Sequence, residues 1–285
     1  MKIITDPREM QKVCISFNDK KRKIGFVPTM GALHEGHLSL LHKAREFSDI
    51  SVISIYVNPA QFGPNEDLAK YPRPFDKDCE IAEKEGCDII FAPKSEDMYP
   101  ENYHTKVSVE DITTRLCGAS RPGHFDGVTT IVLKLFTIVR PDIAVFGQKD
   151  AQQVVVIKRM VDDLNVPVAI EVGPVVREPD GLAMSSRNSY LTENERREVP
   201  LIFSALQQVE KEYERGERSA AKLRKGIESA YRAAHSFKTE YIEIVDTITI
   251  TPLDQIETTA LVAVACRTTE SNTRLIDNVV LGGTL

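Results

Sequence analysis

The fold can be derived outward from the stretch GFVPTMGALHEGH at residues 25–37. Residues 24–27 form a short apolar run that predicts a buried strand, which a proline and a glycine then end. Residues 38–47 carry apolar side chains at helical spacing. The stretch therefore predicts a strand, a glycine turn and a helix start, with His34 and His37 on either side of the first helical turn.

The start of this helix has the properties of an anion-binding site. The backbone N–H groups of a first turn lack partners within the helix and lie at the positive end of its dipole. Gly36 has no side chain to keep a ligand from the backbone, and the imidazoles of His34 and His37 can donate hydrogen bonds to phosphate. Ordinary capping remains an open alternative. A zinc site is disfavoured, because only Glu35 and His42 lie nearby as further ligands.

Length, charge and cysteines limit the class of protein. The chain has 285 residues, 42% of them hydrophobic, which suffices for one large or two modest domains. Its net charge of -6 argues against a nucleic-acid partner. Its five cysteines are scattered without a Cys-x-x-Cys pair, which predicts reduced thiols in a cytoplasmic protein. Since no stretch is long and apolar enough to span a membrane, we expect no membrane partner.

Strands and helices alternate through the first part of the chain. A helix is expected to start at Pro7, with Asp6 as its cap. The strand at 24–27, its helix and the next strand form a parallel βαβ unit, so residues 29–37 and 58–63 should border one crevice. The predicted strands lie at 50–57, 87–93, 105–109, 141–146 and 168–172, and the helices at 76–85, 128–139 and 151–164.

Two strand ends place polar side chains at this crevice. Gln61 follows the strand at 50–57, where its amide can bond a ligand at both ends, although an ordinary surface loop is an equally good interpretation. Lys149 lies at a helix start, where a cation is electrostatically misplaced and requires an anionic partner. Asp150 is expected to cap that helix or to bind a ribose hydroxyl, and Gln153 faces the same space.

Other polar residues are given ordinary roles. Asp76 and Asp78, in the first turn of a predicted helix, are interpreted as caps rather than as catalysts. Arg121 and His124, in the turn before the helix at 128–139, are interpreted as a solvated side chain and a structural one.

A smaller second domain is expected after residue 176. The turn-rich segment at 173–181 predicts a boundary between domains 1–176 and 177–285. Beyond it, Ser185, Ser186 and Arg187 can clamp a polyphosphate, although their composition is also common in loops. The remaining pattern predicts an α+β lid with helices at 193–215 and 220–234 and strands at 240–245, 260–266 and 274–277.

Three segments together resemble the pantoate-beta-alanine ligase family: PTMGALHEGH at 28–37, FGQKD at 146–150 followed by Gln152 and Gln153, and MSSRN at 184–188. The resemblance extends over essentially the whole chain. It implies an α/β fold with a Rossmann-like parallel sheet, helices on both faces and a smaller C-terminal α+β lid. Ala151 and Asp126 depart from the family pattern, in which an aromatic and often a basic residue stand at these positions.

The resemblance implies a cytoplasmic homodimer that uses ATP and Mg2+ to condense (R)-pantoate with beta-alanine. The products would be pantothenate, AMP and diphosphate, formed through a pantoyl adenylate. The residues agree with this chemistry, because carboxylate attack on the α-phosphate of ATP needs cations and hydrogen-bond donors around phosphorus. Two alternatives are a nucleotidyltransferase acting on a phosphorylated small molecule and a non-catalytic nucleotide sensor.

The resemblance also implies roles for individual residues. His37 is the implied proton donor, and we expect His34, Lys149 and Arg187 to act with it. Gln61 and Gln153 are expected to bind pantoate, and Gln61 also beta-alanine. Neither the residues nor the resemblance identifies the magnesium ligands. The residues expected to border ATP are Met30, Gly31, Ala32, Leu33, His34, Glu35, Gly36, His37, Gly147, Gln148, Lys149, Asp150, Val176, Met184, Ser185, Ser186 and Arg187.

Overall fold

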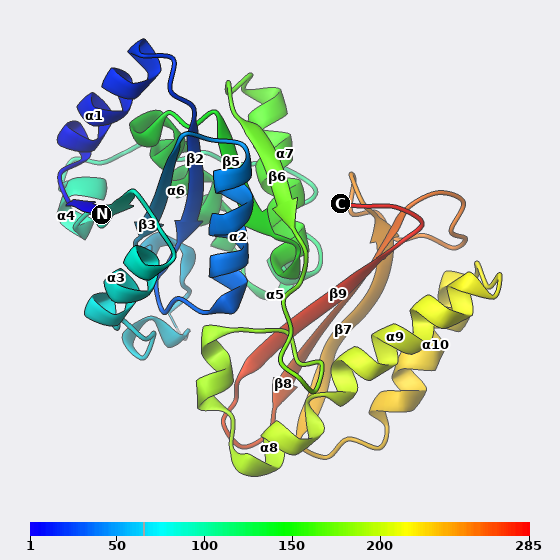
Figure 1. Ribbon diagram of the computed structural model, residues 1–285. Helices are drawn as coiled ribbons and strands as arrows, with labels where there is room; N and C mark the ends of the chain where they lie inside the picture. Colours follow the sequence, from blue (N-terminus) through cyan, green and yellow to red (C-terminus); the bar gives the residue numbers. More distant parts are fainter. Residues whose placement is uncertain (65) are drawn as a thin grey trace.

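The predicted parallel sheet is confirmed. The computed structural model describes residues 1–64 and 66–285, and Figure 1 shows its larger sheet surrounded by helices. All neighbouring strands of this sheet run parallel, in the order β1-β4-β3-β2-β5-β6. The strand order reverses between β2 and β5, and ligands of such sheets bind beyond the strand ends at this point. The strands are β1 (Lys2–Ile4), β2 (Ile24–Thr29), β3 (Ile50–Ile55), β4 (Ile89–Phe91), β5 (Ile143–Gly147) and β6 (Ala169–Gly173).

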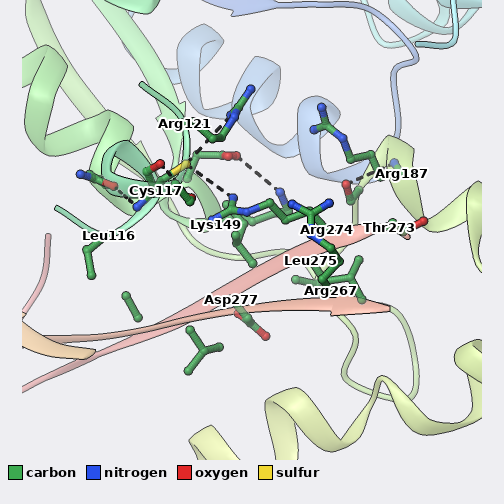
Figure 2. Close-up of a pocket in the computed structure, with 18 of the residues that line it drawn as sticks. Leu116, Cys117, Arg121, Lys149, Arg187, Arg267, Thr273, Arg274, Leu275 and Asp277 are labelled. Atoms are coloured by element: carbon green, nitrogen blue, oxygen red, sulfur yellow. Dashed lines mark hydrogen bonds and ion pairs between the residues drawn. The ribbon is translucent and has the colours of Figure 1, made fainter. Parts of the chain in front are cut away.

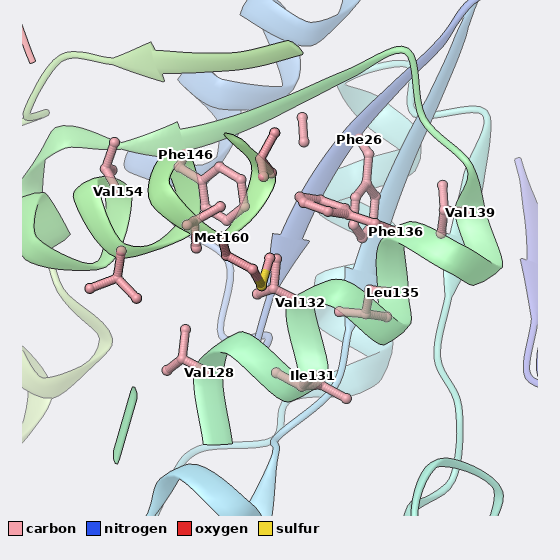
Figure 3. Close-up of a cluster of buried hydrophobic side chains, with 14 of the residues drawn as sticks. Phe26, Val128, Ile131, Val132, Leu135, Phe136, Val139, Phe146, Val154 and Met160 are labelled. Carbon is pink, nitrogen blue, oxygen red and sulfur yellow. The ribbon is translucent and has the colours of Figure 1, made fainter. Parts of the chain in front are cut away.

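Helices cover both faces of the parallel sheet, as predicted. Phe26 on β2 and Phe146 on β5 pack on one face against Phe136 of α6, with both ring pairs edge to face at 6.4 Å (Figure 3). Val27 and Val145 point to the opposite face, where α2 and α3 cover them. The helices of this region are α1 (Pro7–Asp19), α2 (Glu35–Glu46), α3 (Phe75–Lys84), α4 (Ser95–Met98), α5 (Cys117–Ser120), α6 (His124–Val139) and α7 (Ala151–Asp163).

Short turns and caps complete this region. Asp6 caps α1 as predicted, since its Oδ1 accepts a hydrogen bond from the Glu9 N–H at 2.7 Å. No helix in the described ranges is long and apolar enough to cross a membrane. The 3₁₀ turns among residues 1–64 and 66–285 are η1 (Pro59–Gln61), η2 (Asp67–Ala69), η3 (Gln148–Asp150) and η4 (Ser186–Tyr190).

The predicted strand at 105–109 is wrong. These residues, all of which the structure describes, run as an irregular segment across α6. The hydroxyl of Thr130 accepts from the Val107 N–H at 2.9 Å, and the hydroxyl of Thr129 donates to the Val107 carbonyl at 2.7 Å. Threonine side chains therefore satisfy the backbone groups that a neighbouring strand would otherwise bond.

The C-terminal part forms a separate antiparallel sheet in the order β7-β8-β9. Helices α9 and α10 pack on one face of this sheet. On the other face, Val245, Leu261 and Ala263 belong to the same hydrophobic core as residues of α6 and α7. Figure 1 shows the two sheets beside each other. The elements are α8 (Glu193–Glu198), α9 (Leu201–Glu214), α10 (Ala220–Tyr231), β7 (Phe237–Asp246), β8 (Ala260–Thr268) and β9 (Arg274–Leu281).

The predicted helix at 193–215 is two helices. Helix α8 ends at Glu198, and Pro200 takes the N-cap position of α9. Proline cannot donate the backbone hydrogen bond that a continuous helix would require there. The helical spacing of the apolar residues predicted the helices but not the break.

Candidate active site

His34 and His37 close the first turn of α2. The Nδ1 atom of His34 accepts a hydrogen bond from the Gly36 N–H at 3.2 Å, and Nδ1 of His37 accepts one from the His34 N–H at 3.3 Å. The two ring centroids lie 4.1 Å apart. Capping is therefore one role of both side chains. Because Nδ1 accepts in each ring, the neutral imidazole carries its proton on Nε2, where it can donate to a ligand.

Both histidines are neutral near pH 7. Burial lowers the pKa of His34 to about 4, and the positive charge of Lys149 acts in the same direction. Burial also lowers the pKa of His37 to about 3, with further lowering by His34 and Lys149. A bound polyanion would raise both pKa values, because it favours the protonated rings. This site therefore offers neutral donors until an anion arrives.

Asp78 holds the turn between β2 and α2. Its two carboxylate oxygens accept hydrogen bonds from the N–H groups of Ala32 and Leu33, each at 2.8 Å. Asp78 is only 1% exposed to solvent. Gly31 and Ala32 have positive φ angles of 82° and 52°, so this turn is locally unfavourable for ordinary residues. The interpretation of Asp78 as a cap of its own helix is wrong. Its position in a first helical turn gave no sign of a partner 45 residues away.

Lys149 and Asp150 lie at the end of β5, in the turn η3. Lys149 Nζ is 3.6 Å from the Asp150 carboxylate. Asp150 occupies the N-cap position of α7, but within the described chain its side chain makes no capping hydrogen bond. The capping alternative for Asp150 is therefore wrong, and the ribose alternative remains a prediction.

The adjacent glutamines at the start of α7 point to different places. Gln152 is buried, and its amide bonds the backbone of the 112–117 segment, with distances of 2.9 Å to the Cys117 N–H and 2.8 Å to the carbonyls of Ile112 and Arg115. Gln153 lines the cleft, as predicted. Gln152 therefore has a structural role, and Gln153 is available to a ligand.

Gln61 is held by two side chains at the start of α6, those of Arg121 and His124. Its backbone carbonyl accepts from His124 Nδ1 at 2.8 Å and from Arg121 Nη2 at 3.2 Å. Arg121 in turn makes two hydrogen bonds of 2.6 Å to the carboxylate of Glu66. The interpretation of Arg121 as a solvated loop residue is therefore wrong, because its ion pair with Glu66 fixes the guanidinium against the backbone of Gln61. The side-chain amide oxygen of Gln61 accepts from Asn58 Nδ2 at 3.1 Å.

Arg187 joins the 184–188 segment to the loop after β3. Its guanidinium makes two hydrogen bonds to the carboxylate of Asp67, at 2.8 and 2.9 Å. Ser186 donates to the hydroxyl of Tyr71 at 3.2 Å. Ser185 caps η4 by accepting from the Arg187 N–H. These bonds hold the cation of Arg187 at the cleft.

Two cavities that share lining residues bring the predicted residues together. A narrow cavity of about 210 Å³ lies against the 28–37 segment, and a wide one of about 910 Å³ opens toward the antiparallel sheet. Figure 2 shows Arg121, Lys149, Arg187 and Arg274 around the wide cavity. The expected crevice between residues 29–37 and 58–63 is confirmed by the narrow one. The residues that line both cavities are Lys149, Asp150, Gln153, Ser185 and Arg187.

Most of the expected ATP-binding residues line the narrow cavity, including Met30, Gly36, Gly147, Val176 and Met184. A second group supports the turns instead, such as Ala32 and Leu33, whose N–H groups face Asp78. The expected residues that line neither cavity are Gly31, Ala32, Leu33, Glu35 and Gln148.

Of the two departures from the family pattern, Ala151 lines a cavity and Asp126 lines neither. Ala151 is buried at the start of α7 and lines the wide cavity. Asp126 pairs with Lys106 at 2.9 Å.

The known proteins that this chain resembles belong to one family. The family model described as Pantoate-beta-alanine ligase matches residues 2–280. A pantothenate synthetase from Caldicellulosiruptor saccharolyticus is 50% identical over 281 residues, with 99% of each chain covered. One from Thermotoga petrophila is 50% identical over 282 residues, covering 99% of this chain and 100% of the relative.

Solved structures show the same similarity. The pantothenate synthetase from Thermus thermophilus has a TM-score of 0.92 at 42% identity, covering 98% of this chain and 99% of its own. A pantoate-beta-alanine ligase from Francisella tularensis, complexed with Beta-gamma ATP and Beta-alanine, has a TM-score of 0.80 at 35% identity and covers 100% of this chain and 99% of its own. The chain therefore belongs to the pantoate-beta-alanine ligase family.

Proposed function

We propose that the chain forms pantothenate by activating the carboxylate of (R)-pantoate as pantoyl adenylate and then passing the acyl group to beta-alanine. Ligation of pantoate and beta-alanine is the activity of the family to which the chain belongs. The adenylate route rests on one observation: the histidine pair at the start of α2 shares a cleft with Lys149 and Arg187. Such a cluster suits charge that develops on phosphorus and on leaving diphosphate.

In the first step, a carboxylate oxygen of pantoate attacks the α-phosphorus of ATP, and the bond from this phosphorus to diphosphate breaks. The Nε2–H groups of His34 and His37 donate toward the phosphate oxygens, and Lys149 and Arg187 offset their charge. The family likeness makes His37 the proton donor. Its lowered pKa means that the triphosphate must first raise the proton affinity of the ring.

In the second step, the amine of beta-alanine attacks the acyl carbon, and AMP departs with the bridging oxygen. A mixed anhydride reacts readily with an amine, so the protein chiefly aligns the amine and excludes water. We place pantoate between Gln61 and Gln153, where Val128 and Ile131 line the narrow cavity and can contact its branched carbon skeleton. We place beta-alanine beside Gln61.

The Mg2+ of the proposed reaction would bind together with the triphosphate. The described residues contain no group of three or more His, Cys, Asp or Glu side chains that could hold a metal ion. Magnesium is commonly bound by one or two carboxylates together with substrate phosphates. Asp150 would supply such a carboxylate, and the ion would reduce the negative charge of the phosphates. The protein alone is therefore not expected to bind Mg2+ tightly.

We also propose a cytoplasmic homodimer with domains 1–176 and 177–285, the second acting as a lid. The family resemblance supports the dimer, and the cysteines, all five of which are free, support a reducing compartment. Each domain would contain one of the two sheets.

Isotope experiments test the adenylate route. With pantoate present and beta-alanine absent, the enzyme should exchange labelled diphosphate into ATP. Carboxylate ¹⁸O of pantoate should end in AMP once beta-alanine is added. Omitting pantoate is the control, and it should abolish exchange. Formation of ADP and labelled inorganic phosphate would show an acyl phosphate instead. AMP transfer without any need for an amine would favour a nucleotidyltransferase, and absence of turnover with tight ATP binding would favour a sensor.

A further inference from the structure

We propose that Asn278, on strand β9, is a positioning residue for Lys149. The antiparallel sheet would then set the geometry of the phosphate-binding turn at the end of β5. This inference rests on the proposed function only in that it assigns Lys149 to ATP.

The side-chain amide of Asn278 bonds the turn η3 with both of its ends. Its Nδ2 donates to the carbonyls of Gln148 at 2.9 Å and Lys149 at 3.0 Å. Its Oδ1 accepts from Nε2 of Gln148 at 3.2 Å. Asn278 is 3% exposed. An amide can donate two hydrogen bonds and accept at its oxygen, so this arrangement uses both functions of the group.

The turn η3 depends on its contact with Asn278, because helix α7, which follows the turn, gives it little support. Asp150 stands at the N-cap of α7 without a side-chain capping bond in the described part of the protein. The carbonyl that Asn278 holds belongs to Lys149, which lines both cavities. Fixing that carbonyl fixes the direction in which the Lys149 side chain leaves the backbone. Because the lysine side chain is a flexible four-carbon chain, its charge is well positioned only when its backbone is fixed.

A buried ion pair holds Asn278 itself in place. The carboxylate of Asp277 accepts from the Asn278 N–H at 2.7 Å and makes two hydrogen bonds, of 2.6 and 3.0 Å, with the guanidinium of Arg177. Arg177 also donates to the Gly181 carbonyl and stacks on the Phe203 ring, 3.4 Å from its centroid. Asp277 is 4% exposed. The connection therefore runs from the 177–181 segment through β9 to the turn η3.

Replacing Asn278 by aspartate tests this connection with little change in shape. The variant Asn278→Asp puts a carboxylate oxygen where Nδ2 now donates to two carbonyls, so attraction becomes repulsion. The variant Asn278→Ala only leaves the carbonyls without that donor. Both variants keep Lys149. A matched control is Asn18→Asp, because Asn18 Nδ2 also donates to a backbone carbonyl, that of Arg140, at 3.3 Å on a distant part of the fold.

The experiment is calorimetric titration of each variant with ATP and, separately, with pantoate. We expect Asn278→Asp to weaken ATP binding at least about tenfold, the size expected when a buried hydrogen-bonding group loses its partner. Asn278→Ala should weaken it less. Pantoate affinity should stay within about twofold, and the number of sites should match that of Asn18→Asp.

The number of binding sites separates positioning from loss of folded protein. A purely structural role would lower the melting temperature and the number of sites but leave the ATP dissociation constant of the remaining sites unchanged, and this result would overturn the proposal. If Asn278→Asp does not fold, Asn278→Ala is used instead, with the ATP dissociation constant and the number of sites as the same two measurements. The variant Lys149→Ala separates the two proposals. If it binds ATP normally, the assignment of Lys149 under the proposed function fails. If it weakens ATP binding while both Asn278 variants bind normally, only the positioning role fails.

Discussion

The turns that follow β2 and β5 occupy equivalent places in the fold but are held in different ways. Each joins a parallel strand to a helix at the point where the strand order reverses. The turn at 30–37 is supported within the larger sheet region, by the histidine capping box and by Asp78. The turn at 148–150 is supported by Asn278, which lies on the antiparallel sheet. The hydrogen bonds that hold the histidine turn thus come from α2 and α3 beside the parallel sheet, and those that hold the lysine turn come from β9.

The two turns therefore contribute different properties to one cleft. The histidine turn has a strained backbone and neutral donors, and its supports are close to it in space and independent of the second sheet. The lysine turn carries Lys149, whose placement depends on how the second sheet packs. Changes in the second sheet should therefore affect the lysine turn more than the histidine turn.

The largest expected effect comes from the histidine turn. His37→Ala should lower turnover by about a hundredfold or more, the order expected for one lost transition-state donor. Stability should fall only modestly, by about 1 kcal/mol for a lost cap. Turnover and a melting curve would be measured beside His42→Ala, a histidine on the same helix that pairs with Glu85 at 2.9 Å. Near-normal turnover in a folded His37→Ala enzyme would remove this residue from the mechanism.

A smaller effect is expected at the support of the same turn. Asp78→Asn places an amide donor against one of the two N–H groups that the carboxylate now accepts from. The free energy of unfolding should fall by about 1–3 kcal/mol, and diphosphate exchange should slow by about tenfold because the strained turn relaxes. Asp76→Asn, at an exposed position of the same helix, is the control. Equal behaviour of both variants would show that the Asp78 carboxylate does not stabilise the turn.

The two glutamines after the lysine turn should respond in opposite ways. Gln153→Ala should weaken pantoate binding by about tenfold and leave ATP binding and stability nearly unchanged, because its amide faces the cleft. Gln152→Ala should instead lower the melting temperature, since it leaves the buried backbone groups of the 112–117 segment without partners. Calorimetry and thermal unfolding of both variants test this contrast. Loss of ATP affinity in Gln153→Ala, with pantoate affinity intact, would place this residue elsewhere.

The smallest expected effect is on the pH dependence of stability. The pKa of His37 is lowered to about 3 in the folded protein and is about 6.5 in an unfolded chain. Between these values the unfolded state binds a proton that the folded state does not, so stability falls as the pH falls from about 6.5. His37→Gln should reduce this slope by up to about 1.4 kcal/mol per pH unit. Chemical denaturation at pH 7 and pH 5 would measure the change, and an unaltered slope would show that folding does not lower the pKa of the ring.

Residues whose role is set by neighbours along the chain could be predicted from the sequence. The strand, turn and helix at 24–46 follow from apolar periodicity, and the misplaced charge of Lys149 correctly indicated a cleft. Asp78 and Arg121 were given ordinary roles, because the groups they bond lie 45 and 55 residues away. A carboxylate in a first helical turn looks like a cap whether or not a distant turn bonds it.

The sequence by itself determined the α/β class, the parallel order of the first strands and the three segments that border the cleft, because these depend on local periodicity and on short motifs. Only the tertiary structure decided which buried groups support those segments. Asn278 lies 129 residues from Lys149 along the chain, and nothing near either residue encodes their contact. Hydrogen bonds between distant segments depend on how the two sheets pack, and packing is a property of the whole folded chain rather than of any local pattern.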